Sequence, residues 1–463
     1  MTVYGGSFFD DWGVKRIHFV GIGGVGTSGI AELLHTMGFE VSGSDLEETE
    51  ITQRLARLGI KVSIGHNPAN VHGKDLIVYS TAVKEDNPEL IKARELHIPC
   101  IPRAEMLAEL TRVKRGIAVA GSHGKTTTTS LLGIILEEAG FDPTIVVGGI
   151  LKRYNTNAKL GEGEFIVFEA DESDRSFLKF LPLMEVITNI DLEHLETYTD
   201  IDDIKNTFFE FMHRVPFYGL LVLNLDDPNI REMLPRLRRR YVSYGLGHNN
   251  DWYADNIVMG ERMEFDVFHK GRIYDRFTLS IPGRHHVLNA LAAIVVAHRL
   301  NVPVDTIKRA LRNFRGIKRR FDIYARVGDT VVMTDYAHHP REIEAVILTI
   351  LELHKAGRIR VIFEPHLYSR TKLLANEFAR ALSLADEVIV TKIYKAREEP
   401  IPGVTGELIT RKCTIKARYI EDDHTIIEYL RSTTKDGDFF AFLGAGRIYK
   451  LAEEFAKSLH EKQ

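Results

Sequence analysis

The first part of the chain alternates short apolar runs with stretches of helical periodicity. The run Ile17–Val20 predicts a buried strand that enters a glycine turn, and the helical pattern after this turn closes at Gly38. Residues 75–81 and 98–103 predict further short strands, with helical stretches between them. Strands that alternate with helices are typical of a mostly parallel sheet.

The middle of the chain opens a second series of the same kind. A strand is expected over residues 116–121, a loop over 122–127 and a helix over 128–140. Three more strands are expected, over residues 165–171, 185–191 and 219–227. The pattern again favours parallel strands joined by helices.

A change of pattern follows. Residues 254–283 show the alternation of antiparallel hairpins, and amphipathic helices are expected over 284–301 and 304–314. A third series starts near residue 316. Its strands are expected at 330–336, 359–365, 386–394 and 438–446, and its helices at 341–356 and 371–383.

Composition restricts the possible partners. The 463 residues carry a formal net charge of −4, so we expect neither nucleic acid nor an anionic membrane as a partner. Two cysteines, Cys100 and Cys413, are too few for a disulfide framework or a thiolate metal site. The first residues lack the pattern of a signal peptide, and no apolar run approaches the ~18 residues of a membrane span. We therefore expect a cytoplasmic protein.

The first glycine turn has the pattern G-x-G-x-x-G over residues 21–26, after a strand and before a helix. Glycines let the backbone approach a diphosphate, and the helix N-terminus offers unpaired N–H groups. Asp45 ends the next strand, where a carboxylate can accept hydrogen bonds from a ribose or a base. By itself this turn suggests a nicotinamide-dependent dehydrogenase as the first hypothesis.

The second glycine turn, Gly121 to Thr127, also lies between a strand and a helix. It lacks the leading glycine of the longer G-x-x-x-x-G-K-[ST] pattern, because Val119 stands there. Lys125 can reach a β- or γ-phosphate, and Thr126 is placed to bind a magnesium ion. The loop therefore predicts ATP binding.

Acidic residues follow two strands of this second series. Glu169, Asp171, Glu172 and Asp174 end one strand, while Asn189, Asp191, Glu193 and His194 end another. The carboxyl ends of parallel strands face the same crevice as the phosphate loop, where Mg²⁺ is needed. We interpret Asp171 and Asp174 as a solvated turn, and Glu169 and His194 as metal-site residues.

Three tandem α/β domains, each with a largely parallel sheet, are therefore expected. The N-terminal domain (1–111) and the C-terminal domain (317–463) are predicted to be Rossmann-like, and the central domain (112–316) to be of the P-loop type. Two phosphate turns count against the dehydrogenase, which has no use for Lys125. They suggest that one nucleotide is consumed in the reaction, while the other is a part of the substrate by which the enzyme binds it.

Together these motifs resemble those of the ATP-dependent Mur ligases of bacterial cell-wall synthesis, nearly from end to end. The resemblance is carried by "HFVGIGGVGTSGIAELL", "GSHGKTTTTSL", "EADESDRSFL", "TNIDLEHLETY", "GRHHVLNALAAI", "RRFD", "DYAHHPREI", "EPHLYSRT" and "FLGAGRI". The family's phosphate loop has the form G-x-x-G-K-T-T, which is the shorter form found here. The resemblance is greatest to the branch that adds L-alanine.

This resemblance implies an amide ligase. ATP phosphorylates the lactyl carboxylate of UDP-N-acetylmuramate, and the amine of L-alanine attacks the resulting acyl phosphate, a step of peptidoglycan precursor synthesis. A carboxylate is inert toward amines because its leaving group is poor, and phosphorylation removes this obstacle. The implied cofactor is Mg²⁺, as two ions, or Mn²⁺. We expect a monomer or a weak dimer.

The resemblance also implies a role for each motif residue. The catalytic set is Lys125, Glu169, His194 and Arg320, and the metal set is Thr126, Glu169 and His194. The ATP contacts are Gly121, Ser122, His123, Gly124, Lys125, Thr126, Thr127, Asn289, Arg320 and Asp335. The contacts of the UDP-sugar are Gly21, Ile22, Gly23, Gly24, Val25, Gly26, Asp45, His66, Ser80 and Thr81. The amino-acid contacts are Tyr336, His338, His366 and Arg370, of which Arg370 can pair a carboxylate in bidentate fashion.

Three positions depart from the family pattern, and several alternatives stay open. Leu367 replaces the usual arginine, His286 the usual asparagine and Glu193 the usual aspartate. A sister ligase that attaches a preformed peptide to UDP-N-acetylmuramate is the nearest alternative. A nicotinamide-dependent dehydrogenase and a non-catalytic nucleotide sensor are the alternatives from other classes.

Overall fold

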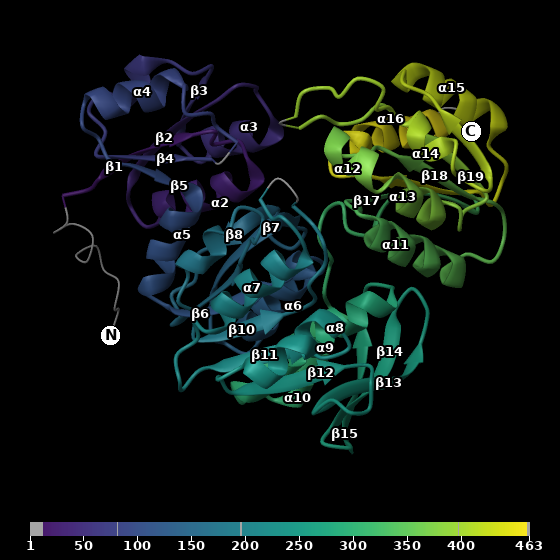
Figure 1. The fold of residues 1–463 in the computed structure, drawn as a ribbon, viewed down its shortest axis with the longest axis horizontal. Helices are drawn as coiled ribbons and strands as arrows, with labels where there is room; N and C mark the ends of the chain where they lie inside the picture. Colours follow the sequence, from purple (N-terminus) through teal and green to yellow (C-terminus); the bar gives the residue numbers. More distant parts are fainter. Residues whose placement is uncertain (1–12, 81, 195–196, 397, 461–463) are drawn as a thin grey trace. The chain divides into compact units, whose positions relative to one another are not determined.

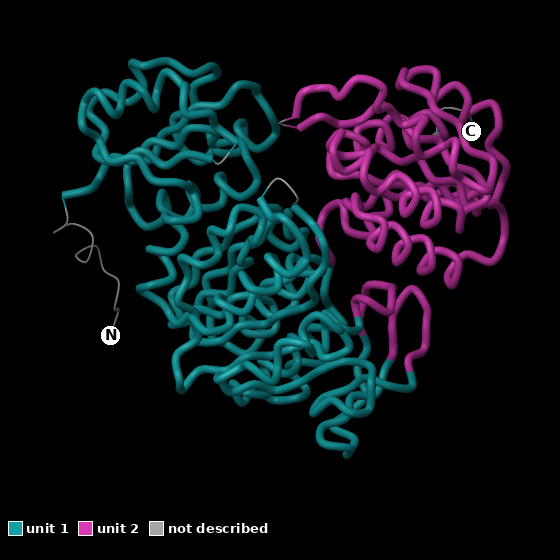
Figure 2. Tube along the Cα trace, in the orientation of Figure 1, with its two compact units in different colours: residues 1–256, 265–278, 287–315 teal, residues 257–264, 279–286, 316–463 magenta. Residues whose placement is uncertain are grey.

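The computed structural model describes residues 13–80, 82–194, 197–396 and 398–460, which divide into two compact units (Figure 2). Unit 1 comprises residues 1–256, 265–278 and 287–315. Unit 2 comprises residues 257–264, 279–286 and 316–463. Among the described residues, no helix is long and apolar enough to cross a membrane.

The first sheet of unit 1 is parallel, with the strand order β3-β2-β1-β4-β5 (Figure 1). Its strands are β1 (Arg16–Val20), β2 (Glu40–Asp45), β3 (Lys61–Ile64), β4 (Leu76–Tyr79) and β5 (Cys100–Pro102). Its helices are α2 (Val25–Thr36), α3 (Glu50–Arg57), η1 (Pro68–Val71), α4 (Pro88–Glu95) and α5 (Arg103–Arg112). The chain order reverses beside β1, and ligands of open α/β sheets bind at such a reversal.

The second sheet has ten strands in the order β15-β14-β13-β12-β11-β10-β6-β9-β7-β8. They are β6 (Arg115–Ala120), β7 (Thr144–Leu151), β8 (Thr156–Lys159), β9 (Phe165–Glu169), β10 (Met184–Ile187), β11 (Leu220–Asn224), β12 (Tyr241–Gly245), β13 (Trp252–Val258), β14 (Met263–His269) and β15 (Arg272–Leu279). The strands from β13 to β7 run parallel, and β8 is antiparallel to β7.

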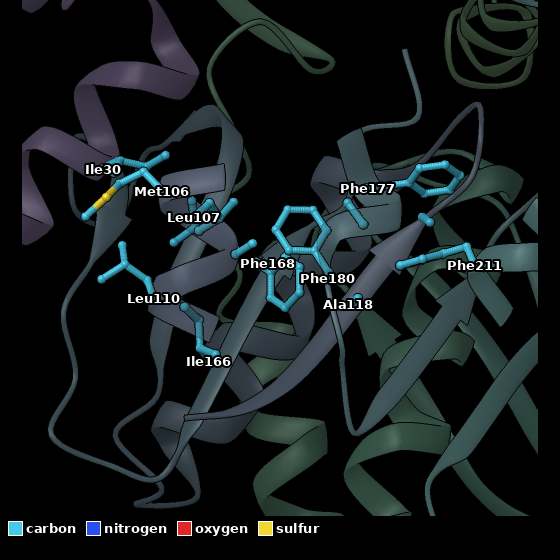
Figure 3. Close-up of a cluster of buried hydrophobic side chains, with 14 of the residues drawn as sticks. Ile30, Met106, Leu107, Leu110, Ala118, Ile166, Phe168, Phe177, Phe180 and Phe211 are labelled. Atoms are coloured by element: carbon cyan, nitrogen blue, oxygen red, sulfur yellow. The ribbon is translucent and has the colours of Figure 1, made fainter. Parts of the chain in front are cut away.

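The helices of this region are α6 (Lys125–Glu138), η2 (Ser176–Lys179), α7 (Ile201–Met212), α8 (Pro228–Met233), η3 (Leu234–Arg236), α9 (Arg284–Arg299) and α10 (Val304–Arg312). Strand β6 is a continuous apolar run because both faces of the sheet are covered. Figure 3 shows part of the resulting core, in which the rings of Phe168 and Phe180 lie 4.8 Å apart between their centroids. This packing fixes the ends of the central strands, from which the functional loops leave.

The sheet of unit 2 has the order β16-β17-β21-β18-β19-β20 and is parallel except for β16. Its strands are β16 (Asp322–Val327), β17 (Thr330–Asp335), β18 (Ile359–Phe363), β19 (Glu387–Val390), β20 (Lys416–Tyr419) and β21 (Phe439–Leu443). Its helices are α11 (Pro340–Leu353), α12 (Tyr368–Leu373), α13 (Ala375–Leu382), α14 (Glu407–Thr410), α15 (Asp423–Thr433) and α16 (Ile448–His460). The predicted fold class of α/β layers on largely parallel sheets is confirmed.

Candidate active site

The phosphate loop joins β6 to α6 and requires glycine at two positions. Gly121 and Gly124 have φ angles of +131° and +84°, which residues with a side chain rarely adopt. A Cβ atom at Gly121 would collide with Thr188 Oγ1, and one at Gly124 would meet Asn289 Oδ1 at 2.5 Å. No side chain caps the start of α6 at Gly124. The N–H groups of the first helical turn, at the positive end of the helix dipole, therefore form an anion site.

The residues after β10 hold this loop in place. The His123 N–H donates to Asn189 Oδ1 (2.8 Å), and Asn189 Nδ2 donates to the His123 carbonyl oxygen (3.0 Å). Thr188 Oγ1 donates to the same carbonyl oxygen (2.6 Å), and the Ser122 N–H donates to the Asn189 carbonyl oxygen (3.0 Å). The predicted ATP contacts Ser122 and His123 are thus fixed by their backbone.

Lys125, the first residue of α6, forms a buried ion pair. Its Nζ lies 2.9 Å from Glu172 Oε1 and 2.8 Å from Glu172 Oε2, and donates to the Gly121 carbonyl oxygen (2.6 Å). Burial lowers the pKa of Lys125, but the charge of Glu172, with that of Asp171, raises it well above its ordinary value. Lys125 therefore presents a permanent positive charge at the phosphate loop.

A cluster of candidate metal ligands lies beside this pair. His194 Nε2 is 3.7 Å from Glu172 Oε1 and 3.8 Å from Glu193 Oε2. One ligand atom from each of these three residues lies within 4.8 Å of the others. The predicted ligand Glu169 ends β9 outside this cluster, and its Oε2 accepts a hydrogen bond from the Gly148 N–H (2.7 Å).

Three further predicted ATP contacts line the same loop. Thr126 and Thr127 are buried in the first turn of α6. Asn289, predicted as an adenine contact, is buried in α9 with its Oδ1 against Gly124. The structure thus places the α9 asparagine beside the phosphate loop, which the sequence could not show.

The first glycine turn leaves β1 at the predicted position. Gly21 has a φ of +79°, and the N–H groups of Gly21 and Ile22 both donate to the Ser44 carbonyl oxygen (2.9 and 3.0 Å). Asp45 Oδ2 accepts a hydrogen bond from the Gly23 N–H (2.8 Å). The carboxylate predicted to contact a ribose or base therefore also braces the turn.

A basic side chain lies over the start of α2. A Cβ atom at Gly26 would collide with Arg103 Nη1, so a side chain there would displace the guanidinium group. Arg103 Nη2 is 3.9 Å from Asp171 Oδ2. A positive charge thus lies beside the glycines predicted to hold a diphosphate. Gly24 and Val25, two further predicted contacts, belong to the same turn.

His66 belongs to a buried hydrogen-bond network. Its Nδ1 lies 3.0 Å from Glu89 Oε2 and 3.0 Å from Ser44 Oγ. Glu89 is fully buried. Burial raises the pKa of Glu89, but hydrogen bonds from His18, Ser44 and Asn70 lower it to about 2. An ionised carboxylate therefore fixes the orientation of the His66 ring.

Two further residues predicted to contact the UDP-sugar come after β4. Ser80 lies against the turn, since a Cβ atom at Gly21 would meet Ser80 Cβ at 3.2 Å. Thr81 lies outside the described residues.

In unit 2, Asp335 ends β17 and is buried. Its Oδ2 accepts from the Phe321 N–H (2.7 Å), and its Oδ1 accepts from the Ala337 N–H (2.8 Å). Burial raises the pKa of Asp335, although the charge of Arg320 opposes this. Arg320 lies over the Tyr336 ring, with Cζ 5.0 Å from the centroid. Besides any ligand contact, Asp335 therefore holds the backbone around Arg320.

The predicted amino-acid contacts of unit 2 come together through their rings. The centroids of Tyr336 and His338 are 5.3 Å apart, and those of His338 and His366 are 5.7 Å apart. Tyr394 extends the row, stacked on His366 at 5.8 Å. Glu342 accepts from the His338 N–H (3.0 Å). Three segments of the chain thus meet at one place.

Arg370, the fourth predicted contact, is buried in α12, and its Nη1 donates no hydrogen bond to any residue that the structure describes. A buried guanidinium nitrogen that no protein group satisfies suits the binding of a carboxylate. Leu367, three residues earlier, is also buried and has a φ of +71°. Its strained backbone costs about 1–3 kcal/mol and starts the helix that carries Arg370.

Sequence reasoning missed several of these residues. Glu172 and Glu193 were noticed as acids but given no role, although their position after parallel strands was the available signal. Arg103, Glu89 and Tyr394 carry no local motif. Only the packing of distant segments reveals them.

Both units thus carry polar residues at the ends of parallel strands, and unit 1 has two glycine turns, one with a lysine and buried acids. These features define a nucleotide-binding α/β enzyme with an ATP-type phosphate loop. Three family profiles match the chain: the Mur ligase family catalytic domain over residues 16–115, the Mur ligase middle domain over 119–297 and the Mur ligase glutamate ligase domain over 319–446. The chain belongs to the Mur ligase family.

Close relatives support this assignment. The UDP-N-acetylmuramate–L-alanine ligase of Geotalea uraniireducens is 48% identical, over 96% of this chain and 98% of the relative. That of a Sulfurihydrogenibium species is 47% identical, over 97% and 99%. The crystal structure of the UDP-N-acetylmuramate-alanine ligase of Thermotoga maritima matches with a TM-score of 0.84 at 31% identity, covering 97% of this chain and all of the other.

A more distant match concerns the fold alone. The MurF ligase of Thermotoga maritima, solved in complex with ADP, has a TM-score of 0.68 at 21% identity and covers 86% of this chain.

Proposed function

We propose that this chain is an ATP-dependent ligase that joins L-alanine to the lactyl carboxylate of UDP-N-acetylmuramate in peptidoglycan synthesis. The supporting similarity is nearly full-length, at 48% identity to a relative named for this reaction. The observation that carries the proposal is the buried contact of Lys125 with Glu172 at the phosphate loop, 2.8 Å long, beside Glu193 and His194. It joins a triphosphate-binding cation to a set of acids suited to phosphoryl transfer.

The reaction has two steps. Transfer of the γ-phosphoryl group of ATP to the lactyl carboxylate yields ADP and an acyl phosphate. The alanine amine attacks the acyl carbon, and the tetrahedral intermediate expels inorganic phosphate and forms the amide. Phosphoryl transfer depends mainly on positioning and charge neutralisation. Lys125 and the N–H groups of the first turn of α6 provide both.

The acids at this sheet edge suit Mg²⁺, which prefers oxygen ligands and retains several waters. We propose Thr126, Glu169 and His194 as its ligands, and Glu172 and Glu193 as further acids that serve a second ion. When bound, Mg²⁺ neutralises charge on the phosphates. Mn²⁺ has similar ligand preferences and would serve as a substitute.

The other substrates are assigned by charge. The diphosphate of UDP-N-acetylmuramate is proposed to bind the turn from Gly21 to Gly26 together with Arg103, and its uridine to contact Asp45, His66, Ser80 and Thr81. The carboxylate of L-alanine is proposed to bind Arg370, near the rings of Tyr336, His338 and His366. Arg320, Asp335 and Asn289 remain proposed ATP contacts.

This assignment gives each part of the chain one substrate. Residues 1–111 are proposed to hold the UDP-sugar, 112–316 the ATP, and 317–463 the amino acid. We further propose a cytoplasmic enzyme that acts as a monomer or weak dimer.

Product analysis tests the proposal. With ATP, UDP-N-acetylmuramate and a mixture of free amino acids, mass spectrometry should find the L-alanyl product, and ADP release should require both the sugar and the amino acid. Oxygen-18 placed in the lactyl carboxylate should appear in the released phosphate. Equal ADP release without either co-substrate, or unlabelled phosphate, contradicts the ligase.

The same assay separates the alternatives. A sister ligase would leave free alanine unused and consume a preformed peptide. A dehydrogenase would change nicotinamide absorbance and release no ADP.

A further inference from the structure

The second sheet of unit 1 has a cavity at the edge opposite the phosphate loop. Its volume is about 650 Å³, and it is lined by the first residues of several strands, among them Arg115 of β6, Phe165 of β9, Met184 of β10 and Leu220 of β11. These strands are parallel, so their first residues share one edge while the phosphate loop leaves the other. The cavity is therefore separate from the candidate active site.

The charge of this cavity is one-sided. Its lining includes Arg112, Lys114, Arg115 and Arg299 and no acidic residue. Arg299, exposed at the end of α9, forms no ion pair with any of the described residues. A cavity with such a lining favours an anionic group.

Three of these cations already have partners in the protein. Arg112 Nη1 lies 3.1 Å from Glu109 Oε1 in a surface ion pair. Lys114 Nζ donates to the carbonyl oxygens of Gly161 and Gly163 (2.5 and 2.7 Å), so it fixes the loop before β9. Arg115 Nε lies 3.3 Å from Glu164 Oε2, and both side chains are more than half exposed. Such an exposed pair contributes little and opens readily to a phosphate.

Further positive charge gathers on other loops at this edge. We define the amino edge as residues 112–115, 160–164, 180–183, 213–219 and 234–240, which contain the loops that enter the neighbouring strands β6, β9, β10, β11 and β12. They contain eight Lys or Arg residues and two acidic residues, in a chain whose net charge is −4. Parallel strand order thus gathers cations that are scattered in the sequence.

Exposed apolar side chains accompany these cations. Phe217 is 83% exposed, Tyr218 62% and Leu181 59%. The Phe217 and Tyr218 rings are 5.1 Å apart between centroids, and Tyr218 and Leu181 line the cavity. Single exposed apolar residues are common, but three around one basic cavity mark an interaction surface.

We propose that the amino edge docks on an anionic phospholipid bilayer, with the cavity holding a headgroup phosphate. Phe217, Tyr218 and Leu181 enter the headgroup region, where amphipathic rings are most stable. Arginines pair with the phosphates, because the guanidinium fork matches a phosphate and sheds water readily. The phosphate loop, at the opposite edge of the same sheet, stays in water.

This proposal departs from the expectation that no membrane would be a partner. That expectation used the net charge, which averages acids and bases over the whole chain. A bilayer senses only the face turned toward it, because charges farther away than the Debye length of about 8 Å are screened.

Vesicle flotation of the full chain tests the proposal. Vesicles of phosphatidylcholine mixed equally with phosphatidylglycerol should carry the protein, vesicles of phosphatidylcholine alone should not, and added salt should release it. The double variant Phe217→Ser, Tyr218→Ser should weaken binding about tenfold or more. Arg299→Glu and Arg240→Glu should each weaken it about fivefold or more.

Matched control variants distinguish docking through the amino edge from non-specific binding to vesicles. Ile273→Ser removes an exposed apolar side chain of β15, and Arg57→Glu reverses an exposed charge of α3. Both should bind vesicles like the parent chain, and all variants should retain parental ATP turnover, which shows that they are folded.

Several outcomes would overturn the proposal. These are absence of binding to the anionic vesicles, equal binding to both vesicle types, and equal losses in the control variants. Retention by an RNA homopolymer without vesicle binding would point to a different class of partner and would equally overturn it. Competition by free glycerol phosphate, with binding otherwise as expected, would locate the headgroup in the cavity.

Discussion

Lys125 and Glu172 form a buried ion pair at the phosphate loop, with Lys125 Nζ 2.8 Å from Glu172 Oε2 and the Glu172 side chain only 2% exposed. Forty-six residues separate them in the sequence, yet each neutralises the charge of the other and fixes its position. Removing one partner of a buried pair leaves an uncompensated charge, which is strongly unfavourable.

The variant Glu172→Gln tests this coupling. It keeps the shape of the side chain but removes the charge that raises the pKa of Lys125. We expect the maximal rate of ADP release to fall about tenfold or more, because Lys125 loses its orientation. The alkaline loss of activity should also begin at lower pH, since a lysine with a lower pKa loses its proton earlier.

Lys125→Met and Lys205→Met are the comparison variants. The first should lower turnover by about two orders of magnitude or more while UDP-N-acetylmuramate still binds. The second, in α7 and paired with Asp202 and Glu232, should leave turnover unchanged. An unchanged alkaline limb in Glu172→Gln would separate the pair from catalysis.

Arg103→Met tests the cation above the first glycine turn. The diphosphate loses a charge-assisted hydrogen bond, so the KM for UDP-N-acetylmuramate should rise about tenfold or more with little change in the KM for ATP. Titration calorimetry with the UDP-sugar alone gives the same comparison without turnover. Arg57→Met, at an exposed position of α3, is the control. An unaltered affinity in Arg103→Met would place the diphosphate elsewhere.

Glu89→Gln tests the buried support of His66. The pKa of Glu89 is about 2, below the ordinary 4.5, so its ionised form stabilises the fold above pH 4.5 and this stabilisation is lost as the pH falls toward 2. The variant should be destabilised by about 3 kcal/mol at pH 7 and less at low pH, as measured by urea unfolding.

The same variant should raise the KM for UDP-N-acetylmuramate several-fold, because the His66 ring is no longer held. Glu95→Gln, at the exposed end of α4, is the control for both measurements. Equal stability loss at pH 7 and pH 3 would refute the ionised state of Glu89.

Arg370→Lys tests the amino-acid carboxylate site. Lysine keeps the charge but not the bidentate fork, so the KM for L-alanine should rise about tenfold or more while the KM for ATP stays within about twofold. Arg380→Lys, exposed on α13, should behave like the parent chain. If the KM for alanine does not move, another group binds the carboxylate.

Glu185→Met tests a buried acid in β10. Glu185 is fully buried, and neither carboxyl oxygen forms a hydrogen bond within the part of the chain that the structure describes. Burial raises its pKa well above 4.5. The folded state therefore holds the proton longer than the unfolded state, and stability declines as the pH rises from 4.5 toward the folded pKa.

Replacement of Glu185 by methionine removes this cost. The variant should be more stable by about 1–3 kcal/mol at pH 8, with a smaller difference at pH 4.5, in urea unfolding. A loss of stability at pH 8 would reveal a polar partner for the carboxyl group.

Much of the architecture was open to prediction. Continuous apolar runs predicted the strands β1, β6, β9 and β17, because a strand that is covered on both faces consists mainly of apolar residues. The glycine turns at 21–26 and 121–127 were recognisable because backbone close to phosphate requires glycine. Side chains such as Asn189 and His194 were expected at the sheet edge, since parallel strands end on one side.

Distances between side chains were not predictable in this way. Asn289 was predicted to touch adenine, which stays a prediction; its position against Gly124 became visible only in the structure, where α9 packs beside the phosphate loop. Arg103 lacks a motif, and its position over Gly26 depends on how α5 packs on α2.

The sequence by itself determined the parallel α/β layers, the two phosphate-binding turns and the chemical identity of the residues after each strand, since these depend on local periodicity and conformation. Only the tertiary structure decided that Glu172 pairs with Lys125, that Glu185 is buried with no hydrogen-bond partner among the described residues, and that cations gather along the amino edge. The physical reason is that pairing, burial and surface potential depend on distances between distant segments, and packing alone sets those distances.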